Sequence, residues 1–387
     1  MKAFVDFYTK EGISPVAQDI EDLEKHFRRR HALYRHVGIV PGFLSGRSIL
    51  EFGPGSGHNS IVTAAMHPAR YVLVDANPVG LEQTRALLEQ FAGGGGTDIS
   101  VAESYIEDFE TSERFDLVLC EGVLPTQEAP TELLSHIARF VRPGGMILIT
   151  CIDAASYLAE QLRRFAAALA TKKEASTEEK LAVLVPLLGP HLDTIEGMGR
   201  SHEDWILDNV IQPFQGRALM GLKEAIDTLH PDFSVHGTSP SFLVDRRWYK
   251  RITGPASDFN AVANQVYLSE LHNFIDVRTA HSVRKPERNR SLLAACNEAY
   301  EAIVSHSEAR DSAVTARVMQ ALEGLRSEMA ELDPLTVRSF DDFLAVAAPL
   351  QAGEQDVDWG NFPSWFGQGQ QYLSLVRDQS LGIPESS

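Results

Sequence analysis

Residues 48–60, SILEFGPGSGHNS, join a short apolar run to a turn that contains three alternating glycines. An apolar run, a glycine turn and a following amphipathic segment together predict a strand, a tight turn and a helix. Glycine at this place leaves the amides of the helix N-terminus free and lets a ligand approach the main chain. One acid, Glu51, stands near the end of the apolar run. A ligand of this turn therefore has to tolerate a carboxylate.

Glu51 separates the two ligand classes that use such a turn. Dinucleotides place a pyrophosphate at the helix N-terminus and favour the spacing GxGxxG. Here the glycines are Gly53, Gly55 and Gly57, so the third comes one residue early. A carboxylate beside two phosphates is also repulsive. The stretch therefore favours a cationic ligand.

Short apolar runs and amphipathic segments then alternate along the chain. The predicted strands are residues 48–52, 71–75, 99–103, 115–121 and 146–152, and the predicted helices between them are residues 59–66, 79–91 and 131–141. Such alternation implies right-handed crossovers and a parallel sheet with helices on both faces. We therefore expect an α/β core over residues 45–154.

The rest of the chain is predicted to decorate this core. We expect an N-terminal helical lid over residues 1–44, whose helix is capped by Ser14, and a helical insertion over residues 155–231. A closing strand pair is predicted within residues 232–250, where residues 237–240 supply turn chemistry. Residues 251–387 then form a helical C-terminal extension, through which a homodimer could assemble.

Four stretches resemble, in order, the motifs of class I S-adenosylmethionine (SAM)-dependent methyltransferases. LEFGPGSG is similar to motif I, VLVDANP to the second motif, FDLVLCEGVL to the fourth-strand motif, and VRPGGMILIT to the turn and strand after it. The resemblance implies a Rossmann-like fold with a mostly parallel seven-stranded sheet, helices on both faces, a large helical insertion and a helical C-terminal extension. It also implies SAM as the cofactor and S-adenosylhomocysteine as the product.

The resemblance assigns cofactor contacts to the first two motifs. Glu51 would face the cationic, methionine end of SAM, and the three glycines would allow close backbone approach. Asp75, followed by Ala76, would accept both ribose hydroxyls, a bidentate role that suits a carboxylate. Two simpler interpretations stay open: Asp75 as an ordinary strand-end acid, and Glu51 as a partner of a helix dipole.

The adenine contacts depend on how the third motif is aligned. Matching IEDF to the family's common ending places Tyr105 and Ile106 beside the adenine, and we favour this alignment. Matching the first acid instead places Glu103 there. Core packing of Tyr105 is an alternative to stacking on a purine.

Glu121 and His202 are the candidate catalytic residues. Glu121 ends the fourth strand, which points at the methyl group in this family, so it could act as a general base, orient the substrate or contact SAM. His202 has an intrinsic pKa suited to proton transfer. The chain lacks the DPPY-type sequence of enzymes that methylate amino groups of nucleic acids and glutamine.

Aromatic and charged residues in the decorations are candidate substrate contacts: Trp205, Arg246 and Trp248. Ion pairs and Trp anchors that join helices to the sheet are the competing interpretation. From the N-terminal lid we select Tyr8 and His26 as cofactor contacts. Gln18, Arg30 and Tyr34 could also face inward, but we expect them at the surface, in line with a solvated face for the basic cluster KHFRRRHALYRH, residues 25–36.

The net charge and the composition exclude some classes of partner. The formal net charge of −18, from 35 basic and 53 acidic residues, argues against a nucleic-acid target. The N-terminus has no apolar stretch of signal-peptide length and no apolar run could span a membrane, so we expect a cytoplasmic protein. The three cysteines have no metal-type spacing, and Cys120 and Cys151 are expected as buried thiols.

These observations predict a SAM-dependent methyltransferase that acts on an O or N atom of a small polar metabolite, such as a sugar, an amino-acid-like molecule or a natural-product intermediate. The arrangement resembles bacterial methyltransferases encoded with polysaccharide or natural-product pathways. Two alternatives stay open. In the first, an enzyme of the same fold transfers the aminocarboxypropyl arm of SAM or cyclises SAM, releasing methylthioadenosine. In the second, the chain is a non-catalytic binding or scaffold protein.

Overall fold

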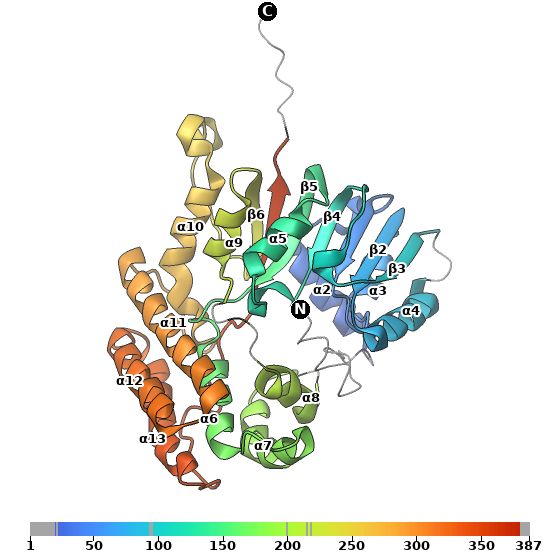
Figure 1. Cartoon of the computed structure of the whole chain (residues 1–387). Helices are drawn as coiled ribbons and strands as arrows, with labels where there is room; N and C mark the ends of the chain where they lie inside the picture. Colours follow the sequence, from blue (N-terminus) through green and yellow to red (C-terminus); the bar gives the residue numbers. More distant parts are fainter. Residues whose placement is uncertain are drawn as a thin grey trace, which may run out of the picture. The chain divides into compact units, whose positions relative to one another are not determined.

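The computed structural model describes residues 20, 22–92, 96–198, 200–213, 216 and 219–379. The chain divides into two compact units (Figure 1). We call Met1–Cys151, Met220–Tyr267 and Gln371–Ser387 the α/β unit, and Ile152–Leu219 and Leu268–Gln370 the helical unit. Most of the predicted insertion, up to Leu219, and most of the predicted C-terminal extension thus fold together in one unit, whereas the last part of the insertion, from Met220, belongs to the α/β unit.

The α/β unit is built on a seven-stranded sheet in the order β3-β2-β1-β4-β5-β7-β6 (Figure 1). The strands are β1 Ser48–Phe52, β2 Arg70–Asp75, β3 Asp98–Glu103, β4 Phe115–Cys120, β5 Val141–Cys151, β6 Phe233–Ser239 and β7 Gln371–Arg377. Neighbours among β1 to β5 pair in parallel, whereas β7 is antiparallel to both β5 and β6. The predicted mostly parallel seven-stranded sheet is confirmed.

The helices of this unit follow the predicted alternation. They are α2 Leu23–His36, α3 Ser60–Ala64, α4 Pro78–Ala92, α5 Pro130–Ala138 and α9 Leu222–Leu229, with short 3-10 turns at Pro41–Phe43, Ile106–Asp108, Leu124–Thr126, Tyr249–Arg251 and Gly254–Ser257. Helix α10, Phe259–Glu270, begins in the α/β unit and ends in the helical unit. The predicted Ser14 cap lies outside the described residues. Asp22 caps α2, and its carboxylate accepts a 2.9 Å hydrogen bond from the Lys25 amide.

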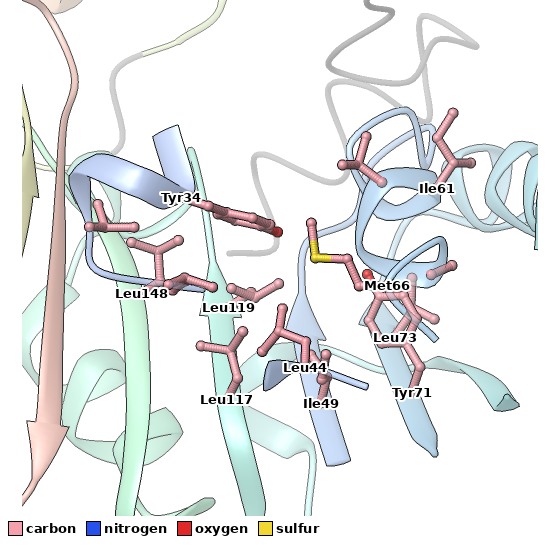
Figure 2. Close-up of a cluster of buried hydrophobic side chains, with 14 of the residues drawn as sticks. Tyr34, Leu44, Ile49, Ile61, Met66, Tyr71, Leu73, Leu117, Leu119 and Leu148 are labelled. Atoms are coloured by element: carbon pink, nitrogen blue, oxygen red, sulfur yellow. The ribbon is translucent and has the colours of Figure 1, made fainter. Parts of the chain in front are cut away.

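A buried cluster fills the space between α2, α3 and one face of the sheet (Figure 2). Strand residues two positions apart share a face, and Ile49, Leu73 and Leu117 bury their side chains in this cluster. Glu51 follows Ile49 on the same face. Phe52 points to the opposite face, where it packs edge-on against Phe109 with ring centres 5.6 Å apart. Both faces of the sheet are therefore covered.

The prediction of a closing strand pair within residues 232–250 is right for one strand and wrong for the other. β6 lies there, but residues 240–248 form no helix or strand, and the antiparallel partner of β6 is β7. The segment after β6 soon becomes charged at DRR, residues 245–247, whereas β7 alternates so that Leu373 and Leu375 are fully buried. β7 therefore completes the sheet from within the stretch that the sequence predicted to be helical.

The helical unit contains α6 Leu158–Ala170, α7 Thr177–Leu192, α8 His202–Ile206, α11 Pro286–Ala309, α12 Ser312–Glu328 and α13 Pro334–Gln351, with short turns at Leu207–Ile211 and Leu271–Phe274. A fully buried arginine, Arg163, lies at its centre. The guanidinium donates to the carbonyls of Trp365 and Pro363 at 2.9 and 3.0 Å, and it lies 3.8 Å from the ring centre of Phe366.

The cysteines and the apolar character of the helices were also predicted from the sequence. Cys120, Cys151 and Cys296 are all buried, which confirms the prediction for the first two. Over the described residues, no helix has the length and apolar character needed to cross a membrane.

Candidate functional site

The glycine turn lies between β1 and α3, at the carboxyl ends of the parallel strands. Gly53, Gly55 and Gly57 all have positive φ, at +69°, +57° and +81°. A Cβ atom on Gly53 would lie 2.5 Å from Cγ2 of Val123, and one on Gly57 would lie 2.8 Å from Cα of Thr84. These positions exclude side chains, so the turn presents bare backbone to a ligand.

Glu51 is buried directly before this turn, with 7% of its surface exposed. Its Oε1 accepts a 3.0 Å hydrogen bond from Oγ of Ser60, and its Oε2 accepts one from the hydroxyl of Tyr71. Burial raises the pKa of Glu51 to about 7. The carboxyl is thus held by two neutral donors and has no cation bound directly to it among the described residues.

Asp75 ends β2, the strand beside β1. Its Oδ1 accepts from the Asn77 amide at 2.9 Å, and its Oδ2 accepts from the Gly55 amide at 3.3 Å. Burial raises the pKa of Asp75. The carboxylate is therefore oriented by the glycine turn itself, and Ala76 follows it, half-buried.

The third predicted motif begins beside Asp75. The Ser104 amide donates to the Asp75 carbonyl at 3.0 Å, which brings the end of β3 next to the end of β2. Tyr105 follows half-buried and Ile106 is buried, while Glu103 is exposed. Both alignments of this motif stay predictions.

Helix α2 carries a polar stripe on its buried face. His26, Arg30 and Tyr34 are buried, with 7%, 6% and 0% of their surfaces exposed. His26 Nε2 lies 2.8 Å from the carbonyl oxygen of His58, directly after the glycine turn. Desolvation lowers the pKa of His26, which favours the neutral form of the ring. The expectation that Arg30 and Tyr34 lie on a solvated face is wrong.

Arg30 pairs with Glu121, the residue that follows β4. Both contacts of this bidentate ion pair, Nη1 to Oε2 and Nη2 to Oε1, measure 2.7 Å, and the two side chains are 7% and 13% exposed. Nη2 of Arg30 also lies 3.4 Å from the Tyr34 hydroxyl, which lies 2.9 Å from Oγ1 of Thr63. Glu121 could act as a proton acceptor only by releasing Arg30.

The other predicted site residues have local contacts. His202 and Trp205 lie in the helical unit, where Nε2 of His202 is 3.1 Å from Asp193. Arg246 and Trp248 lie on the segment after β6, exposed, with Nζ of Lys250 5.3 Å from the Trp248 ring centre. Tyr8 lies outside the described residues.

The arrangement at the carboxyl ends of β1, β2 and β4 fits a cationic ligand that also carries a diol. The side chains excluded at Gly53 and Gly57 leave a backbone cradle, Glu51 supplies a buried acid, and Asp75 supplies two carboxylate oxygens beside the same turn. A pyrophosphate would meet both acids. Within the described part of the chain, no group of three or more His, Cys, Asp or Glu could hold a metal ion.

Comparison with known proteins identifies a methyltransferase domain in part of the chain. Residues 25–181 match a family model described as a methyltransferase domain. An arsenite methyltransferase of Aquipseudomonas alcaligenes is 29% identical over 141 residues, covering 34% of this chain and 41% of that protein. A phthiotriol/phenolphthiotriol dimycocerosates methyltransferase of Mycobacterium ulcerans is 29% identical over 136 residues, covering 35% and 46%. The chain thus spans less than half the length of these two curated relatives.

Among solved structures, the N-methyltransferase NodS from Bradyrhizobium japonicum WM9, in complex with S-adenosylhomocysteine, is 21% identical with a TM-score of 0.31. That match covers 39% of this chain and 75% of NodS. The sheet order and the motif set define a Rossmann-like methyltransferase fold. The matched family model and these relatives support a class I SAM-dependent methyltransferase domain within residues 25–181, with S-adenosylmethionine as the cofactor.

Proposed function

We propose that this chain is a SAM-dependent methyltransferase that transfers a methyl group to an O or N atom of a small polar metabolite. The observation that carries the proposal is the convergence of Glu51, the glycine turn and Asp75 at the carboxyl ends of β1 and β2, where open α/β sheets bind ligands. The matched methyltransferase domain supports the reaction class.

The residues take distinct roles in this proposal. Asp75 accepts hydrogen bonds from the ribose hydroxyls, Glu51 faces the cationic methionine end of SAM, and Tyr105 and Ile106 flank the adenine. When bound, the cofactor supplies an electrophilic methyl carbon on a sulfonium. The chain contributes orientation and exclusion of water, which account for much of the barrier reduction in a displacement between two bound reactants.

We infer the class of methyl acceptor from the net charge of the chain and from the residues proposed to contact the substrate. A net charge of −18 disfavours a nucleic-acid acceptor. His202, Trp205, Arg246 and Trp248 remain the proposed substrate and proton-transfer residues, and assembly through the C-terminal region remains a prediction. The names of the relatives range from an arsenite methyltransferase to a phthiotriol dimycocerosates methyltransferase, so they point to no single acceptor.

Product analysis tests the proposal. The purified chain is incubated with SAM, alone and with a panel of polar acceptors, and the thioether product is identified by mass spectrometry. Acceptor-dependent S-adenosylhomocysteine supports methyl transfer. Methylthioadenosine would instead support aminocarboxypropyl transfer or cyclisation, and no binding of SAM would favour a scaffold protein.

A further inference from the structure

The buried face of α2 is polar where amphipathic helices are usually apolar. His26, Arg30 and Tyr34 follow at intervals of four residues, so they lie on one face of the helix. Arg28 lies on another face of the same helix, with 79% of its side chain exposed. An arginine is seldom buried unless it is paired, so this stripe needs a physical reason beyond packing.

α2 contacts the sheet at three places along its length. Near its start, His26 meets the carbonyl of His58 beside the glycine turn. In its middle, Arg30 holds Glu121 at the end of β4. At its end, the Val37 carbonyl accepts a 2.8 Å hydrogen bond from Oγ of Ser374 on β7. The helix therefore spans the sheet from the glycine turn to the last strands.

The middle contact is the strongest of the three. A bidentate guanidinium–carboxylate pair fixes both distance and orientation, and it is worth more than a neutral hydrogen bond. Nε of Arg30 is buried and has no acceptor among the described residues, so Glu121 is the acid that sets the position of the guanidinium. Breaking one partner would leave the other charge buried and unpaired, which is strongly unfavourable.

The pair also arranges charge at the site. Glu51 and Glu121 leave the sheet on the same face and from adjacent strands, since Glu51 is in register with Leu119. Arg30 compensates the charge of Glu121. Glu51, by contrast, is held by Ser60 and Tyr71, has no cation bound to it among the described residues, and lies directly before the glycine turn.

We propose that Arg30 is a positioning residue of the cofactor site, which acts through its ion pair with Glu121 to hold α2 against the glycine turn. Glu121 is then the anchor of this helix rather than a proton acceptor. The inference rests on the proposed function, because it assumes that the glycine turn binds SAM.

The test measures SAM affinity by calorimetry in Arg30→Met, Glu121→Gln and the double variant, with Arg28→Met as a matched control on the exposed face of the same helix. Each single variant is expected to weaken SAM binding by about 5- to 150-fold, the range of typical coupling between sites. The double variant should weaken it no further, since both substitutions break one interaction. Arg30→Lys, which keeps the charge but not the bidentate fork, should recover only part of the affinity.

A second readout needs no ligand. Amide hydrogen exchange in residues 23–36 of the SAM-free protein should quicken in Arg30→Met and stay unchanged in Arg28→Met. Wild-type affinity in a folded Arg30→Met, or single losses that add in the double variant, would overturn the inference. Absence of SAM binding by the unmodified protein would overturn the proposed function instead, and the exchange data would still report whether the pair holds α2.

Discussion

Replacing Glu51 by glutamine should change the pH dependence of stability in a defined direction. Glu51 is buried, and its carboxyl is held by the hydroxyls of Ser60 and Tyr71 rather than by a cation. Burial raises its pKa from 4.5 to about 7. Because the folded state holds this proton more tightly than the unfolded state, the stability that Glu51 contributes is complete below pH 4.5 and is lost as the pH rises through 7.

The magnitude follows from the two pKa values. The difference, 7 − 4.5, is about 2.5 units. At 1.36 kcal/mol per unit this corresponds to about 3 kcal/mol lost between the acidic and alkaline limits. Glutamine cannot ionise, so Glu51→Gln should be close to the unmodified protein near pH 5 and more stable by up to about 3 kcal/mol near pH 8.5.

Urea unfolding at half-unit steps from pH 5 to 8.5 measures this difference. Glu107→Gln, an exposed acid in the same unit, is the matched control and should show no pH-dependent difference. The same Glu51→Gln variant should bind SAM more weakly, since the cationic end of SAM then faces a neutral amide in place of a carboxylate. A stability difference that stays flat with pH, or a variant less stable than the unmodified protein at pH 8.5, would refute the reasoning.

Three further perturbations test other parts of the fold. Gly57→Ala should cost about 2–5 kcal/mol in urea unfolding, because φ is +81° and the new Cβ meets Thr84; a cost below about 0.5 kcal/mol would contradict the cradle. Both ring nitrogens of buried His191 have no partner among the described residues, so His191→Phe should raise the melting temperature, more at pH 5 than at pH 7. That pH effect follows because burial lowers the pKa of His191 to about 3, and equal shifts at both pH values would count against it. Arg163→Met should destabilise the chain by about 2 kcal/mol, measured by urea unfolding, because the buried carbonyl of Trp365 loses its charged donor and the part-buried carbonyl of Pro363 loses one of its donors; an unchanged midpoint would contradict this.

Local patterns predicted the centre of the α/β unit well. β1 and the glycine turn are specified by residues adjacent in the chain, and Asp75 is marked by its position at the end of the next strand. Positive φ at all three glycines, and the hydrogen bond from the Gly55 amide to Asp75, are consistent with the predicted cradle. The roles of these side chains toward SAM stay predictions.

Long-range pairing could not be read from the sequence. β7 joins the sheet between β5 and β6, although 131 residues lie between Ser239, where β6 ends, and Gln371, where β7 begins. Nothing in the local sequence QYLSLVR specifies which strands it pairs with. The alternation of polar and apolar residues in QYLSLVR was the sequence signal that this segment forms a strand. Arg30 was missed for a similar reason, because a basic residue in a basic helix resembles a solvated one until Glu121 is placed opposite it. The four-residue spacing of His26, Arg30 and Tyr34 was the signal that could have found it.

The most direct test of the central claim is a calorimetric titration of SAM into the unmodified chain and into Asp75→Ala. Asp98→Ala, at the start of β3 and paired with Arg70, is the matched control. Loss of charge-assisted hydrogen bonds to the ribose, at about 1.5–3 kcal/mol each, predicts at least about tenfold weaker binding by Asp75→Ala and unchanged binding by Asp98→Ala. SAM binding that is absent from the unmodified chain, or equal in the two variants, would contradict the account.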